Sequence, residues 1–127
     1  MTGGRWAGVV IGLAAPMVAV ACGACAEDTV AATYDHAVVE RAATQGKVLV
    51  YASIDGVGDA RVLANKAGAA ARRAAGIDRA TVRVSAAPLA LSFAIDPSVQ
   101  TVEGAVADVQ KRGKDQGMRL SVVRVMP

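Results

Sequence analysis

Both cysteines of this 127-residue chain stand close together, as Cys22-x-x-Cys25 in the stretch "VACGACAED". That spacing suits a redox pair or two of the ligands of a zinc site. A redox pair begins a helix that follows a strand inside a folded domain, whereas these cysteines close an apolar run. A zinc site needs further ligands, and His36 is the single histidine of the chain. The context favours a targeting segment, and we predict no metal and no cofactor.

The N-terminus has the layout of an export signal. Arg5 precedes an uncharged apolar stretch over residues 6–26, and the acidic pair Glu27-Asp28 follows it. A positive start, an apolar middle and small residues before a polar chain are typical of a secretory signal. Positive charge before the stretch and negative charge after it predict that the rest of the chain is exported. The expected location is secreted, or anchored at the outer face of the cell membrane.

Three fates of this segment remain open. Cleavage after the "ACA" of residues 24–26 would leave a cysteine-free chain that begins at Glu27. Lipidation of Cys22, which ends the lipobox-like stretch "AVAC", would tether the domain to the membrane. Retention of the whole segment would make it a single membrane span, because the apolar run just reaches the roughly 20 residues that a span requires.

The length and the net charge of the chain limit the number of domains and the kinds of partner that we expect. A chain of 127 residues holds one domain, which we place at residues 47–127, after a signal or anchor over 1–26 and a short helix or linker over 27–46. The net charge of +3 is a mild excess with both signs mixed along the chain. A nucleic-acid binder would carry a dense basic face, so we expect no nucleic-acid partner.

Hydrophobic periodicity predicts a regular series of elements after the N-terminal segment. Stretches rich in β-branched or alternating apolar residues predict strands, and apolar residues three and four apart predict helices. The predicted elements are a strand over 47–55, a helix over 60–75, strands over 78–86 and 89–95, a helix from Pro97 to about 112, and a strand from about Met118.

The order strand, helix, strand, strand, helix, strand predicts an α+β domain of the ferredoxin-like β-α-β-β-α-β type. Right-handed crossovers would place both helices on one face of a four-stranded antiparallel sheet. The inner stripe of the first helix is rich in alanine, which would let this helix lie close to the sheet. The core stripe predicted for the second helix consists of Val99, Val102, Val106 and Val109.

Other side chains with catalytic potential have simpler explanations. His36 stands beside Asp35 on a weak helix, and no serine, cysteine or second histidine is placed to complete a site with it. The glycines of "DGVGDA" lack the remainder of a phosphate-binding motif and predict a turn. Four aspartates fall at the ends of predicted elements, where caps and turns explain them: Asp55, Asp59, Asp78 and Asp96. We therefore predict no catalytic residues.

The sheet face opposite the helices is expected to be bare and mildly basic. An RNA-recognition domain would stack bases on aromatic residues there, and at most Tyr51 is available. Such a face suits contact with another envelope protein or with a second copy of the chain, and the edge strand ending "VVRVMP" could accept a partner strand. The candidate binding residues are Thr81, Arg83, Ser85, Ser92, Arg119 and Ser121.

The stretch "AAARRAAGIDRATVRVSAAPLALSFAID", followed by "VEGAVADVQKRGKDQGMRLSVVRVMP", resembles the alkaline-shock protein family and the related domain of its membrane anchor. The resemblance covers about residues 47–126. It implies a non-enzymatic role in envelope homeostasis at the inner side of the membrane, whereas the predicted export places this chain on the other side. The matching places are Gly76-Ile77, 81–84, 89–95, Val109-Gln110, Gly117-Met118 and 122–125.

The chain is also similar, more faintly, to the ring-building domain of secretion-system and sporulation lipoproteins. Those proteins combine a lipidated cysteine with a helix, a "-GV--A-V-V-" stretch and a hairpin, and they imply assembly in the envelope. We therefore predict a non-enzymatic bacterial cell-envelope protein that acts by protein–protein binding or self-assembly. The alternatives are a small-ligand binding module, using a cleft between Asp55-Gly56 and the helix starts, or an undetected hydrolase.

Overall fold

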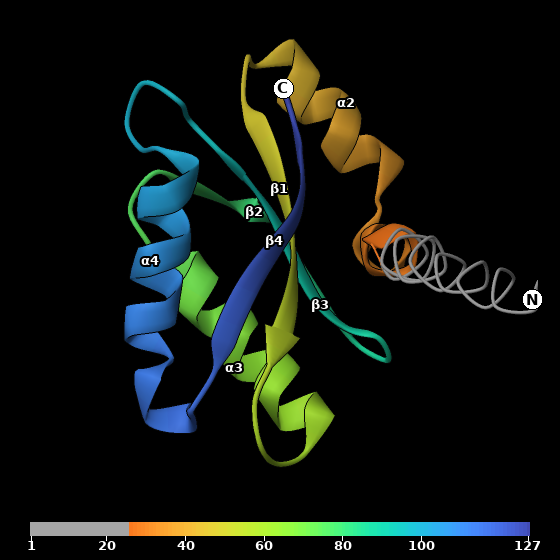
Figure 1. Ribbon diagram of the computed structural model, residues 1–127. Coiled ribbons are helices and arrows are strands. Elements are labelled where there is room, and N and C mark those ends of the chain that lie inside the picture. The colour runs from red at the N-terminus through yellow and green to blue at the C-terminus, as the bar shows by residue number, and fades with distance from the viewer. Residues whose placement is uncertain (1–25) are drawn as a thin grey trace, which may run out of the picture.

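The computed structural model describes residues 26–127. They form an α+β domain in which one four-stranded antiparallel sheet, ordered β2-β3-β1-β4, has helices on both faces (Figure 1). In chain order the elements are a helix over residues 26–33, α2 (His36–Thr44), β1 (Val48–Asp55), α3 (Ala60–Arg73), β2 (Ile77–Ala86), β3 (Leu89–Ile95), α4 (Val102–Arg112), the 3₁₀ helix η2 (Lys114–Gln116) and β4 (Arg119–Met126).

Residues 1–25 of the predicted export segment, including Cys22 and Cys25, lie outside the described residues. Within residues 26–127, no helix combines the length and the apolar content that crossing a bilayer requires.

Strand β1 is one of the two inner strands of the sheet. It pairs with β3 on one side and with β4 on the other. Its side chains alternate between two apolar clusters, with Val50 and Ile54 in one and Leu49 and Tyr51 in the other. Because all four side chains are buried, the middle of β1 is covered on both faces.

The larger core lies between the sheet and the helices α3 and α4. Phe93 of β3 and Val109 of α4 are both fully buried in it. Helix α3 presents small residues to the sheet, and Ala67 and Ala71 have no exposed surface at all. These alanines let the helix backbone approach the strands closely, as the alanine-rich stripe predicts. Each large apolar side chain buried here contributes about 1.5 to 3 kcal/mol.

The opposite face of the sheet is covered, and the expectation of a bare face is wrong for its central strands. The helix of residues 26–33 and α2, together called the covering segment (residues 26–46), lie across this face (Figure 1). Val30 and Val38 of this segment pack against Leu49 and Tyr51. These apolar groups on the second face of β1 need a cover, and the thin apolar stripe of the covering segment supplies it.

The covering segment contains two helices where the sequence predicts one. The side chain of Asp35 accepts hydrogen bonds from the backbone N–H groups of Ala37, at 3.0 Å, and Val38, at 3.4 Å. Asp35 itself has an extended backbone with φ of −138°, so it ends the first helix and caps α2. The break at this residue is what lets the segment turn across the sheet.

Helix α4 begins later than predicted. Thr101 caps it by accepting a backbone N–H at 3.0 Å, and the first helical residue is Val102. The predicted cap, Asp96, instead accepts hydrogen bonds from the backbone N–H and hydroxyl of Ser98 within a turn. Val99 consequently lies on this turn with 64% of its surface exposed and does not belong to the core stripe.

The turn between α3 and β2 requires glycine. Gly76, in the turn that follows the end of α3 at Arg73, has a φ of +81°, in the left-handed region. A side-chain carbon at this position would also lie 2.5 Å from the Cβ of Gln100. The close approach fixes the turn against the loop that precedes α4.

We predict that Ala67→Leu destabilises the domain by about 1 to 3 kcal/mol, because three extra carbons would be forced between α3 and the sheet. Urea unfolding measures the change directly. Asn65→Leu is the matched control, since Asn65 is exposed on the same helix and its replacement should change stability by less than about 0.5 kcal/mol. Equal stability of the two variants would contradict the close packing of α3.

Candidate functional site

The candidate binding residues do not share one open surface. Because β2 and β4 are the two outer strands, residues predicted to act together lie at opposite edges of the sheet. Thr81 and Ser92 are buried at 1% and 2% exposure, Arg83 and Ser85 are half-buried on β2, and Arg119 and Ser121 are exposed on β4.

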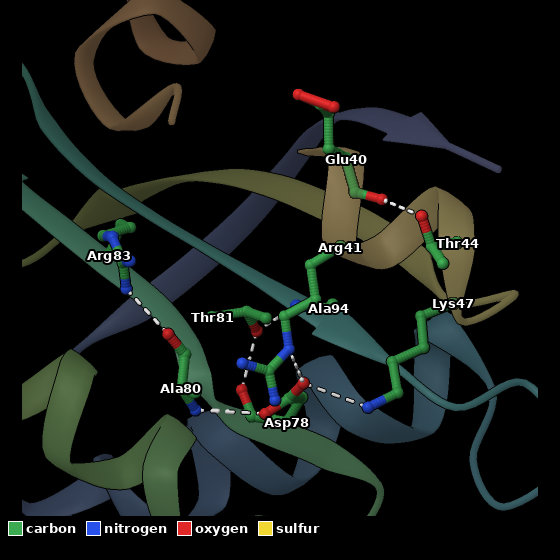
Figure 2. Close-up of polar contacts among 9 residues, drawn as sticks. All are labelled: Glu40, Arg41, Thr44, Lys47, Asp78, Ala80, Thr81, Arg83 and Ala94. Atoms are coloured by element: carbon green, nitrogen blue, oxygen red, sulfur yellow. Dashed lines mark hydrogen bonds and ion pairs between the residues drawn. The ribbon is translucent and has the colours of Figure 1, made fainter. Parts of the chain in front are cut away.

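The two buried residues hold the backbone together. The hydroxyl of Thr81 donates to the carbonyl of Asp78 at 2.6 Å and accepts the N–H of Ala94 at 2.8 Å (Figure 2). It replaces a ladder hydrogen bond where β2 leaves its register with β3. Ser92 donates its hydroxyl to the carbonyl of Thr33, at 3.5 Å, and so connects β3 to the covering segment. Both side chains act within the fold and are inaccessible to a partner.

Arg83 is also engaged within the chain. Its Nε lies 3.2 Å from a carboxylate oxygen of Asp35, and its Nη1 donates to the carbonyls of Ala80 and Val82 at 2.9 Å (Figure 2 draws the bond to Ala80). The hydrogen bond from Arg83 is the main cause that holds the pKa of Asp35 below its ordinary value. Partial burial opposes it, and the two N–H groups that Asp35 caps assist it.

Asp78 forms ion pairs with two positively charged side chains at the same edge of the sheet. Its carboxylate lies 3.0 Å from Lys47 Nζ and 3.5 Å from Arg41 Nε (Figure 2). Burial of Asp78 acts to raise its pKa. The hydrogen bond from Lys47, the N–H of Ala80 and the two positive charges outweigh burial, so the pKa of Asp78 lies below its ordinary value. The prediction that Asp78 is only a turn residue is therefore incomplete.

The covering segment is fastened at both edges of the sheet. Arg83 and Asp78 of β2 hold it through Asp35 and Arg41 of the segment. At the other edge, Arg124 of β4 pairs with Glu27 at 2.6 Å. Together with the buried valines these contacts pack residues 26–46 against the sheet.

The side chains considered for chemistry stay dispersed. His36 is exposed and pairs with Glu40 at 2.9 Å across one helical turn. Within residues 26–127, no three His, Cys, Asp or Glu side chains come together as a metal-binding group. The surface hollow at the start of α3 does not include the predicted cleft residues Asp55 and Gly56; its lining is Asp59, Ala60, Arg61, Ala86 and Ala87.

An exposed apolar groove lies between α4 and the edge strand β4, and we call it the α4/β4 groove. Its volume is about 350 Å³. Val122 and Val125 on the strand side keep 42% and 43% of their surface exposed. The residues lining the groove are Val102, Glu103, Val106, Ala107, Gln110, Val122 and Val125.

The groove follows from how α4 packs. Ala105 and Val109 form the inner face of the helix and are fully buried. The positions beside this inner face of α4 therefore lie next to β4 but are not fully covered by it. Gln110 ties the two elements together, since its side-chain oxygen accepts the N–H of Leu120 at 2.8 Å. Among residues 26–127, β4 has β1 as its only neighbour in the sheet, and no further strand of this part of the chain lies at its outer edge.

The groove has one acidic and one basic end. Glu103 lines it near the start of α4. Beyond the shared residues Ala107 and Gln110, a second hollow continues along the same helix and is lined by Lys111, Lys114, Gly117, Met118 and Arg119. In the part of the chain that the structure describes, none of Glu103, Lys111, Lys114 and Arg119 has an ion-pair partner.

Most of this groove was not predicted from the sequence. Val106, predicted for the core stripe, is half-buried against the larger core and also lines the groove. Of the predicted binding residues, only Arg119 lines the surface described here. The predicted edge strand was the useful signal, because "VVRVM" holds more apolar residues than one buried face of β4 can take.

Comparison with known proteins finds no family model, curated protein or solved structure that matches this chain significantly.

We predict that Asp78→Asn lowers stability near neutral pH and flattens its loss in acid. The folded-state pKa of Asp78 lies below the ordinary value of 3.8. Its carboxylate therefore contributes stability above that pH, and this contribution disappears as pH falls through the folded-state pKa. Urea unfolding at a series of pH values from about 7 to about 2 measures the effect.

The matched control for this pH series is Asp115→Asn, which removes an exposed carboxylate from the turn before β4. The control should follow the wild-type profile. A wild-type profile for Asp78→Asn would contradict the role given to the cluster around Asp78.

Proposed function

We propose that this chain is a non-enzymatic bacterial cell-envelope protein that acts by binding another protein or by self-assembly. The observation that carries the proposal is the α4/β4 groove, in which exposed valines lie beside an unpaired sheet edge. Soluble domains rarely expose apolar side chains as a contiguous, shaped surface unless something covers them. An edge strand also offers backbone groups to a partner.

The edge geometry indicates how a partner would dock. Tyr51 and Ala52 of β1 face Arg124 and Val122, so Val123 is an additional residue in β4. Such a bulge twists the strand and interrupts continuous pairing along it. The groove side chains, rather than a full-length added strand, would then provide most of the contact.

We also propose export, with the N-terminal segment connecting the domain to the membrane or being removed. The charge pattern of residues 1–28 supports this proposal, and Cys22 is the lipidation candidate if the segment is processed as a lipoprotein signal. A tethered domain would meet its partners at a raised local concentration, which favours contacts of modest area.

The ferredoxin-like architecture is the finer fold that we propose. The observed strand order, β2-β3-β1-β4, supports it, as does the position of α3 and α4 on one face of the sheet (Figure 1). The covering segment would then be an addition to that arrangement on the second face.

A photo-reactive amino acid at Val122 tests the proposed function in the envelope of a bacterial host that makes the full chain. We expect a covalent adduct with a protein, because Val122 would lie inside the contact. The matched control is position Val57, which is 93% exposed in the turn before α3 and far less enclosed. Adducts at both positions in equal yield, or no protein adduct at Val122, would contradict the proposal.

A further inference from the structure

We infer that the occupant of the α4/β4 groove is a second copy of this chain, docked about a two-fold axis that passes near Ala107. This inference rests on the proposed function and specifies the partner. In the resulting pair the two α4 helices run antiparallel, and each groove covers the other.

The register of α4 carries the inference. Glu103, Ala107 and Lys111 follow one another at intervals of four residues, so they lie along one face of the helix. All three are exposed. With a rise of 1.5 Å per residue, Glu103 and Lys111 are separated by about 12 Å along the axis. Ala107 is the midpoint of this interval, so a two-fold axis there sets Glu103 of each copy opposite Lys111 of the other.

The apolar part of the groove fits the same axis. Val106 lies beside Ala107 on the helix, and Val122 and Val125 line the strand side. A two-fold operation at Ala107 brings these valines against their counterparts, which removes both exposed apolar surfaces from water. Ala107 is the smallest side chain on the contacting face, and its size allows the two helices to approach closely.

The charges favour a second copy over an unrelated partner. The surface is acidic where Glu103 lines the groove, and it is basic where Lys111, Lys114 and Arg119 line the adjoining hollow. A uniformly acidic or basic partner would match one end and repel the other. A second copy in antiparallel orientation matches both ends at once, and symmetry makes each favourable contact twice. A parallel orientation would set Glu103 against Glu103.

The helix dipole explains part of the charge pattern but not all of it. Glu103 lies in the first turn of α4 and Lys111 in the last, where each charge also stabilises the isolated helix. The dipole gives no reason for the exposed valines beside these charges, or for the small residue midway between them. Self-complementarity accounts for the three features together.

Charge reversal in separate chains tests the inference. Glu103→Lys creates a copy that is basic at both contact positions, and Lys111→Glu creates one that is acidic at both. Each variant alone should dimerise roughly tenfold more weakly than wild type, since both contacts then join like charges. An equal mixture should form a mixed dimer, because each contact then joins opposite charges.

Native mass spectrometry of the full-length chains, with one variant labelled with nitrogen-15, separates the mixed dimer from the two symmetric ones. The matched control is Lys66→Glu mixed with Glu40→Lys, which makes the same charge changes at exposed positions of α3 and α2. These controls should dimerise like wild type, separately and mixed. Thermal unfolding confirms that every variant is folded.

Recovery of dimers specifically in the mixture of Glu103→Lys and Lys111→Glu would establish the two-fold contact. A wild-type chain that stays monomeric, variants that dimerise as wild type does, or a mixture that stays monomeric would overturn it. The identity of the protein cross-linked at Val122 distinguishes the proposed function from the inference that a second copy occupies the groove. An adduct with a different protein leaves the proposed function intact and rejects the second copy as occupant.

Discussion

The burial of both faces of β1 is the constraint on which the domain depends. One face supplies Val50 and Ile54 to the core under α3 and α4, and the other supplies Leu49 and Tyr51 to the layer under the covering segment. Both layers are needed, because an uncovered second face would leave a leucine and a tyrosine in water. The ion pairs at the two sheet edges then hold the second layer in place. The outer edge at β4 and its flanking helix lie outside both layers and stay open to a partner.

The sequence predicted the central fold well because its signals are local. Alternation in "LALSFAI" and the alanine stripe of α3 each report one element and one buried face. Asp59 marks a helix start and caps α3 in the structure, whereas α3 ends at Arg73, before the left-handed Gly76 is reached. The start of α4 was wrong because two capping residues compete there. Asp96 forms a turn with Ser98, and Thr101 caps the helix.

The second layer and the groove could not be predicted because they depend on contacts between distant residues. Nothing near Thr81 or Ser92 shows that residues 26–46 will cover them, since the pairing of Asp35 with Arg83 spans 48 positions. The groove likewise arises where Ala105 and Val109 turn inward and leave Val106 beside β4. Hydrophobic spacing marks Val106 as apolar but does not measure how completely a neighbouring strand covers it.

Hydrogen exchange of the full chain, compared between dilute and concentrated samples, tests most directly whether the α4/β4 groove is a contact surface between two copies of the chain. We predict that amides of α4 and of β4 from Val122 to Met126 exchange more slowly in the concentrated sample, while the exchange of those of β2 at the opposite edge is unchanged. Protection confined to β2 or to the covering segment would contradict it. An exchange pattern independent of concentration would contradict it as well.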